Sequence, residues 1–253
     1  MTPLAAPMTS KRTASRPHRR RWPAWSWYPV ELVGLALAVI VAATAVTWMV
    51  TPSTADAMGL VAAKDGAHHT TTVGTDQLPR QLAEALIATE DASFYHDHGV
   101  NVEGIVRAGV YDARHRCTCE GGSTIAQQLA EDLYLNGDDG TVGGRWEDLV
   151  LTLKLETHLS STQVLDAYAS ELYLGHGTVG VVQAAQVYFH RRLADLTLAQ
   201  DALLAGLPQA PSGYDPIDHP QLARLRRATV LHQMVVQGYV TAAQAIQATH
   251  APV

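Results

Sequence analysis

Cysteine is nearly absent from this chain of 253 residues, which contains only Cys117 and Cys119. Two cysteines separated by one residue are too few for a disulfide framework, and we interpret them as loop thiols or a local staple. The 12 histidines are scattered apart from two short pairs, so we single out no metal-ligating residue. The sequence therefore excludes a disulfide-rich scaffold and gives no sign of a structural zinc module.

Regular alternation of apolar and polar residues is also missing, and no internal repeat is visible. A substantial β-sheet is therefore not expected. Apolar residues instead recur at helical spacing over 80–91, and Asn101 is placed to cap a second apolar helix. We predict a mainly α protein whose helical domain comprises residues 76–253.

Local signals place several helix ends within this domain. Three capping boxes predict helix starts, because in each a threonine is followed three residues later by a glutamine that bonds back to it. They are Thr124 with Gln127, Thr197 with Gln200, and Thr241 with Gln244. Gly206 with Pro208 indicates one helix end, and Gly238 indicates another. Pro220 indicates the start of a helix.

Basic residues are scarce over most of the chain. The first 30 residues hold six of the 18 Lys and Arg side chains and none of the 24 Asp and Glu side chains. Twelve basic residues therefore face 24 acidic residues in the remainder. A strongly acidic domain of this kind is not expected to bind nucleic acid.

Residues 30–50 form one apolar run whose only charge is Glu31. This length spans a bilayer core as a helix, and tryptophans near both ends suit the membrane interfaces. The basic residues 1–29 predict a cytoplasmic tail, followed by a single-pass anchor and an extracytoplasmic remainder. The alternative is a signal peptide cleaved near Ala55-Asp56-Ala57, although the apolar run is longer than a usual signal core. Residues 51–75 lack periodicity and are predicted to be a linker.

An acidic pair, Glu90 and Asp91, ends the helical pattern of 80–91 and is followed by the aromatic Phe94. A neighbouring like charge and apolar surroundings both raise the pKa of a carboxyl group, which suits a general base or acid. A solvated helix end is the alternative explanation for two acids at this place.

A second segment, residues 121–129, reads Gly-Gly-Ser-Thr-Ile-Ala-Gln-Gln-Leu. Glycines let the backbone approach a ligand closely, Ser123 and Thr124 offer hydroxyl groups, and free N–H groups of a first helical turn favour negative charge. Gln127 and Gln128 add neutral donors and acceptors that suit sugar hydroxyls. An ordinary helix cap preceded by glycine explains the hydroxyl groups but not the paired glutamines.

Together these segments resemble the first two motifs of the peptidoglycan glycosyltransferases, the glycan-polymerising module of bifunctional penicillin-binding proteins and of monofunctional transglycosylases. The resemblance runs from about residue 80 to residue 240 in unbroken order. It implies a lysozyme-like helical fold with Glu90 as the general base. It also implies a set of substrate-binding residues from the two motifs: Asp91, Phe94, Ser123, Thr124, Gln127 and Gln128.

The family's third motif, Arg-Lys-x-x-Glu, falls on Gly144-Arg145-x-x-Asp148. The resemblance therefore implies a catalytic role for Asp148 and a substrate-binding role for Arg145. Arg191 stands where the family commonly has lysine and is a further substrate-binding candidate. Both arginines would stabilise a pyrophosphate leaving group, with Arg107 a weaker candidate.

Three residues depart from the family pattern: Asp97 replaces histidine, Glu131 replaces lysine, and Asp148 replaces glutamate. Glu131 places negative charge where a cation is expected near the pyrophosphate. One compensation is a Mg²⁺ or other divalent cation recruited by the extra carboxylates Glu131, Asp132 and Asp148. The departures therefore concern the leaving group, whereas activation of the acceptor looks complete.

The resemblance implies a membrane-attached enzyme that polymerises lipid II into glycan strands and releases undecaprenyl pyrophosphate. The chain contains no Ser-x-x-Lys followed by Lys-Thr-Gly, so a monofunctional enzyme is expected, with any transpeptidase partner a separate protein. A family member that binds lipid II or glycan without polymerising it is the main alternative. A lysozyme-like hydrolase fits the combination of residues 121–128 and a membrane anchor less well.

Overall fold

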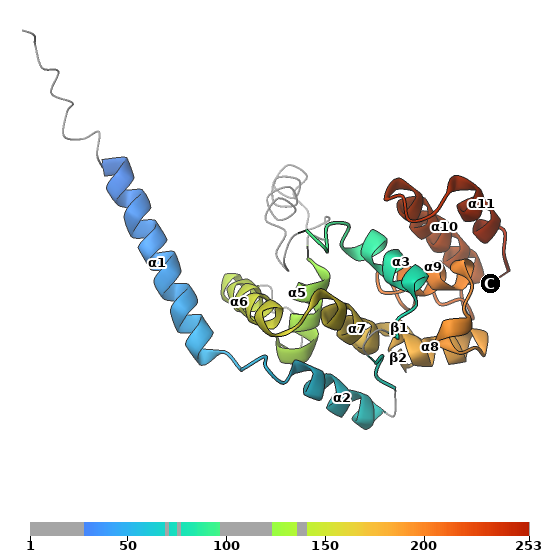
Figure 1. Cartoon of the computed structure of the whole chain (residues 1–253), viewed down its shortest axis with the longest axis horizontal. Coiled ribbons are helices and arrows are strands. Elements are labelled where there is room, and N and C mark those ends of the chain that lie inside the picture. Colours follow the sequence, from blue (N-terminus) through green and yellow to red (C-terminus); the bar gives the residue numbers. More distant parts are fainter. Residues whose placement is uncertain (1–27, 69–70, 75–76, 97–122, 136–140, 253) are drawn as a thin grey trace, which may run out of the picture. The chain divides into compact units, whose positions relative to one another are not determined.

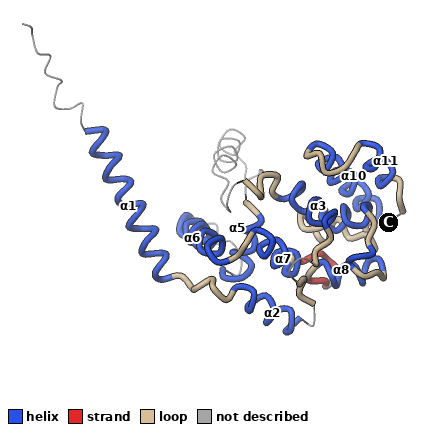
Figure 2. The backbone as a smooth tube through the Cα atoms, in the orientation of Figure 1, coloured by secondary structure: helices blue, strands red, loops and turns tan. Residues whose placement is uncertain are grey.

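A computed structural model describes residues 28–68, 71–74, 77–96, 123–135 and 141–252. The chain divides into two units, Met1–Thr44 and Ala45–Val253, and each is described by itself. Figure 1 shows that helices dominate the described part, and Figure 2 shows the strands as one short hairpin. The prediction of a mainly α protein is confirmed.

The first helix, α1 (Tyr28–Val50), is apolar around its whole circumference. Its stretch Glu31–Val50 has a mean hydropathy of 2.3, and none of it is buried against other parts of the protein. Length and composition therefore suit a membrane-spanning helix, as the sequence predicts.

The helices of the second unit enclose a single hydrophobic core. In chain order its elements are α2 (Ala57–His68), α3 (Arg80–Glu90), α5 (Ile125–Ala130), the π-helical turn η2 (Glu131–Leu135), α6 (Val142–His158), α7 (Ser161–Glu171), β1 (Tyr173–Gly175), β2 (Thr178–Val179), α8 (Val181–Phe189), the 3₁₀ turn η3 (Leu193–Asp195), α9 (Leu198–Gly206), α10 (Pro220–Val236) and α11 (Ala242–Thr249). Helices α3, α9 and α10 pack on one another, and α5 packs on α6 and α7 (Figure 1).

Helix ends follow the local signals closely. All three predicted capping boxes form, at the starts of α5, α9 and α11, and a fourth forms between Ser160 and Gln163 at the start of α7. Pro220 is the first residue of α10, and Gly238, with a φ of 77°, follows its end. These ends are determined by side chains within four residues, which explains why sequence alone locates them.

The prediction that residues 51–75 form a linker is wrong over most of its length. Helix α2 lies there, and Ala57, Val61 and Val73 are buried in the core. The buried face of α2 carries Ala57, Val61 and Asp65, which are four residues apart. Because the last of these is an aspartate, the apolar periodicity of the helix is not visible in the sequence. Lys64 binds α7 through Glu171 at 3.0 Å.

The same segment is bonded to the domain at both ends. At its start, the buried Lys154 of α6 donates from Nζ to the carbonyl and hydroxyl oxygens of Thr51, at 3.0 and 2.8 Å, and to the carbonyl oxygen of Pro52 at 3.0 Å. At its other end, the Val73 N–H donates to Ser170 Oγ at 2.9 Å. Residues 51–68 and 71–73 are therefore packed parts of the domain, and we call them the N-terminal seam.

Candidate active site

Glu90 is the last residue of α3, and its side chain is half-buried where α3 meets α5. Burial raises the pKa of Glu90, while the hydrogen bond from Gln128 and the positive charge of Arg226 lower it. The net effect is a raised pKa, so this carboxylate binds a proton more readily than an exposed glutamate does. This is a property of a general base.

Gln128 connects Glu90 to the core. Its Nε2 lies 3.4 Å from Glu90 Oε2, and its Oε1 accepts a bond of 2.9 Å from the hydroxyl of Tyr168. Tyr168 is almost fully buried, and its pKa is raised well above 10.0 by burial and by nearby carboxylates. The tyrosine hydroxyl therefore keeps its proton and donates a hydrogen bond to Gln128 Oε1. This bond leaves the amide nitrogen of Gln128 to face Glu90.

Gln127 makes the equivalent connection to the second predicted catalytic residue. Its Nε2 lies 3.4 Å from Asp148 Oδ2 on α6, while its Oε1 accepts from the N–H of Thr124. The two neighbouring glutamines thus turn to two carboxylates, one on α3 and one on α6. We call these two pairs, Glu90 with Gln128 and Asp148 with Gln127, the carboxylate–glutamine cluster.

Asp91 joins the two sequence segments directly. It is buried, and its Oδ2 accepts a bond of 3.2 Å from the N–H of Ile125, the first residue of α5. Two of the N–H groups that were expected to be free at this helix start are occupied, that of Ile125 by Asp91 and that of Gln127 by the Thr124 hydroxyl. The carboxylate of Asp91 thus joins the start of α5 to the residue that follows Glu90.

Two other predicted residues of this region differ in exposure. Phe94 is buried in the hydrophobic core and packs edge-to-face on Tyr95, with ring centroids 5.2 Å apart. Ser123 is exposed just before the cap residue Thr124. Asp97, Gly99, Arg107, the two cysteines and residues 121–122 lie outside the described residues.

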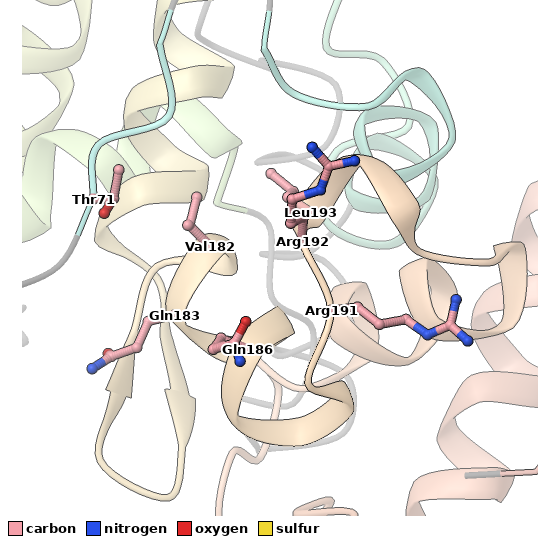
Figure 3. Close-up of a pocket in the computed structure, with 7 residues that line it drawn as sticks. All are labelled: Thr71, Val182, Gln183, Gln186, Arg191, Arg192 and Leu193. Atoms are coloured by element: carbon pink, nitrogen blue, oxygen red, sulfur yellow. The ribbon is translucent and has the colours of Figure 1, made fainter.

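The predicted cations do not share one location. Arg145 is exposed in the first turn of α6, three residues before Asp148. Arg191 lies in the loop after α8, where its Nη1 donates to the carbonyl oxygen of Asp195 at 3.3 Å. It borders a pocket of about 360 Å³ lined by Thr71, Val182, Gln183, Gln186, Arg191, Arg192 and Leu193. In Figure 3 the Arg191 side chain extends away from Gln183 and Gln186.

The positive charge that acts on Glu90 comes instead from Arg226 on α10, which the sequence analysis missed. Its Nε donates to the carbonyl oxygen of Gly206 at 2.9 Å, and its guanidinium lies 5.8 Å from the ring centre of Tyr214. A Cβ atom at position 206 would lie 2.8 Å from Arg226 Cγ, so the absence of a side chain there makes room for the arginine. Nothing in the sequence distinguishes Arg226 from the exposed Arg224 on the same helix.

The carboxylates proposed to recruit a cation are separated in the fold. Glu131 and Asp132 lie in η2, and Lys64 donates to the carbonyl oxygen of Asp132 at 2.8 Å while it pairs with Glu171. Asp148 lies on α6 and faces Gln127. In the described stretches these three acids do not gather into a group that holds one ion by itself.

Comparison with known proteins identifies the family of this chain. The family model "Transglycosylase" matches residues 58–235. Penicillin-binding protein 1F of Bacillus subtilis is 39% identical over 176 residues, which cover 70% of this chain and 24% of the relative. Penicillin-binding protein 1A of Aquifex aeolicus is 38% identical over 197 residues, which cover 78% of this chain and 27% of the relative.

The chain thus spans about a quarter of the length of these curated relatives. A crystal structure of penicillin-binding protein 1A from Haemophilus influenzae covers 72% of this chain and 18% of that chain at 22% identity, with a TM-score of 0.43, too low to establish a common fold by itself. The matched range begins inside α2, so the family includes part of the N-terminal seam. The resemblance read from the motifs is confirmed, and the chain belongs to the transglycosylase family.

Proposed function

We propose that this protein is a peptidoglycan glycosyltransferase that polymerises lipid II, with Glu90 as the general base. The observation that carries the proposal is the carboxylate–glutamine cluster, in which Gln128 faces Glu90 and Gln127 faces Asp148. Family membership supports the reaction class, and the burial of Glu90 supports its role as a base.

In the proposed reaction Glu90 accepts the proton of the acceptor sugar's 4-hydroxyl group. The oxygen attacks the anomeric carbon of the donor, and the bond from that carbon to undecaprenyl pyrophosphate breaks, so the configuration inverts. The amide of Gln128 orients the carboxylate of Glu90. General-base assistance of this kind contributes roughly 10²- to 10⁴-fold in rate.

The 3.4 Å separations of Glu90 from Gln128 and of Asp148 from Gln127 are long for hydrogen bonds. Catalytic hydrogen bonds are often long without substrate and shorten in the reactive complex. The glutamines therefore have donors that can turn to sugar hydroxyls without the loss of a strong bond.

Leaving-group stabilisation is assigned to cations. Arg145 precedes Asp148 on α6, and Arg226 places positive charge next to Glu90. A divalent cation remains part of the proposal, since Mg²⁺ is commonly held by one or two carboxylates together with the phosphate oxygens of a substrate. Under this proposal Asp148 assists the donor side of the reaction.

The membrane anchor α1, an extracytoplasmic domain and cooperation with a separate transpeptidase complete the proposal. The candidate span at Glu31–Val50 supports the anchor, and the basic residues before it support the orientation. A membrane-attached enzyme meets a lipid-linked donor in the plane where that donor diffuses.

A second function is favoured by one observation: Glu131 replaces the basic residue of the family pattern. Lys64 reaches η2 but is engaged by Glu171, so it does not simply restore the lost charge. In this second proposal the protein binds lipid II or glycan without polymerising it.

The test incubates the purified full-length protein with lipid II, with and without Mg²⁺, and follows glycan polymer by gel electrophoresis. We expect polymer with the unaltered protein and with Glu84→Gln, a control on the same helix whose partner is the surface residue Arg80. Glu90→Gln should abolish polymer. Binding of lipid II without polymer from any form would establish the second function, and degradation of preformed glycan would indicate a hydrolase.

A further inference from the structure

Three side chains of metal-ligating type gather beside the β1–β2 hairpin, and none of them is assigned a part in the proposed reaction. His176, Asp215 and Asp218 each place one ligand atom within 4.8 Å of the others. His176 lies in the turn between β1 and β2, and the two aspartates lie in the segment before α10. The histidine and the first aspartate are 39 residues apart, so no local motif reveals the group.

The Asp215 carboxylate is held in one orientation. Asp215 is buried, and its Oδ1 accepts from the N–H groups of Ile217 at 2.8 Å and Asp218 at 3.4 Å. Its Oδ2 is thereby directed to His176 Nδ1, 3.3 Å away. A carboxylate whose second oxygen is fixed before any ligand arrives loses little conformational entropy when it binds an ion.

The distance between His176 Nδ1 and Asp215 Oδ2 fits two ligands of one metal ion better than it fits a strong direct hydrogen bond. A charge-assisted N–H···O bond is usually about 2.7–2.9 Å long. Two ligands of a tetrahedral ion with bonds of about 2.0–2.1 Å lie about 3.3–3.4 Å apart. The observed 3.3 Å between His176 Nδ1 and Asp215 Oδ2 matches the second value.

The surroundings carry uncompensated negative charge. Among the described residues, Asp215 forms an ion pair with His176, which is charged only when it is protonated. A divalent cation would neutralise both aspartates.

The two ligand-bearing segments are pressed together by backbone contact. A Cβ atom at Gly175 would lie 2.7 Å from the carbonyl oxygen of Pro211, so only glycine allows this approach. His176 itself has a φ of 48°, between two glycines with φ of 86° and 71°. The backbone that carries His176 is therefore fixed next to the segment that leads to the aspartates.

We propose that His176, Asp215 and Asp218 form a binding site for a divalent transition-metal ion of the Zn²⁺ type, which ties the β1–β2 hairpin to the segment before α10. One imidazole nitrogen and two carboxylate oxygens suit Zn²⁺ and Mn²⁺, and three protein ligands leave a position for water. None of the three residues is assigned a part in the proposed reaction at Glu90, and the expected effect of the ion is to stabilise the folded domain.

The test uses the full-length protein stripped of metal with a chelator. Zn²⁺ binding is measured by calorimetry, Co²⁺ binding by its visible absorption, and thermal stability with and without Zn²⁺. The variants are His176→Asn and Asp218→Asn, both at exposed residues, and His232→Gln is the matched control at an exposed histidine of α10. Circular dichroism verifies that each variant is folded.

We expect the unaltered protein and His232→Gln to bind one equivalent of Zn²⁺ that His176→Asn and Asp218→Asn do not bind. If the two site variants still bind this ion, their affinity should be at least about tenfold lower. Zn²⁺ should also raise their Tm, and this increase should be lost in His176→Asn and Asp218→Asn. Equal binding and equal Tm shifts in all four proteins would refute the site. A Tm increase with Mg²⁺ but not with Zn²⁺ would contradict the proposed class of metal.

Discussion

The carboxylate–glutamine cluster and the contacts that join the N-terminal seam to α6 and α7 are both polar, yet they are bonded differently. Lys154 of α6 makes three hydrogen bonds of 2.8–3.0 Å to the seam, and Lys64 of the seam pairs with Glu171 of α7 at 3.0 Å. In the cluster, the bonds to Glu90 and Asp148 are both 3.4 Å. Short bonds in the seam hold two chain segments together, whereas long bonds at the cluster leave carboxylates able to exchange partners.

The sharpest test of this difference is Glu90→Gln. Polymerisation should fall by roughly 10²- to 10⁴-fold, because the base is lost while the shape is kept. Stability should not fall, since an amide avoids the cost of burying a carboxylate. Product formation and Tm of the same preparation provide the two measurements, and a large decrease in Tm would contradict the assignment.

Lys154→Met should have the opposite outcome. Removal of the ammonium leaves the carbonyl and hydroxyl oxygens of Thr51 and the carbonyl oxygen of Pro52 without this donor, so the free energy of unfolding should fall by about 2 kcal/mol. Activity per folded molecule should be retained. Chemical denaturation in detergent checks the first expectation, and lipid II turnover by the remaining folded protein checks the second.

The pH dependence of the reaction reports on the cluster alone. Burial raises the pKa of Glu90 above its ordinary 4.5, so the base gains its proton, and the rate falls, at a higher pH than for an exposed glutamate. Arg226 opposes this shift. Arg226→Gln should therefore move the acid limb of the pH–rate profile to higher pH, whereas Arg224→Gln on the exposed face of α10 should not.

The proton linkage of Glu90 has a defined sign. Its raised folded-state pKa means that the folded protein binds this proton more tightly than the unfolded chain does. The corresponding stabilisation is fully present below the unfolded pKa and is lost as pH rises through the folded pKa. The unaltered protein should therefore become less stable relative to Glu90→Gln as pH rises across this window.

The smallest expected effect comes from a comparison of two capping boxes, one at the start of α11 and one at the start of α5. Thr241→Ala removes the cap of α11, far along the chain from the cluster, and should cost about 1 kcal/mol of stability with no change in activity. Thr124→Ala removes the equivalent cap of α5, whose Gln127 also faces Asp148. It should reduce turnover as well, and equal activity in the two variants would contradict the role given to Gln127.

Local sequence signals predicted a large part of the fold. Capping boxes, Pro220 and Gly238 act within one helical turn, so their effects are visible without tertiary information. Helix α2 was missed because Asp65 occupies a buried position that pattern analysis reserves for apolar residues. A buried acid becomes acceptable only through contacts that the rest of the fold supplies.

The contacts among the predicted site residues could not be predicted from the sequence. Gln128 faces Glu90 across 38 positions of sequence and Tyr168 across 40, and no spacing rule pairs them. The motif resemblance implies that the glutamines bind substrate, and this stays a prediction; the structure adds that each also faces a carboxylate. Arg226 depends on the bare backbone of Gly206, which from the sequence alone indicates only a helix end.

The bond between Asp91 and the first N–H of α5 has a consequence for how this chain can change through evolution. It fixes the start of α5 against the residue that follows Glu90, at the point where the two motifs meet. Loss of the Asp91 carboxylate should therefore displace Gln128 from Glu90 even where both of those residues are kept. Position 91 is constrained in this way although its side chain takes no part in the proposed reaction.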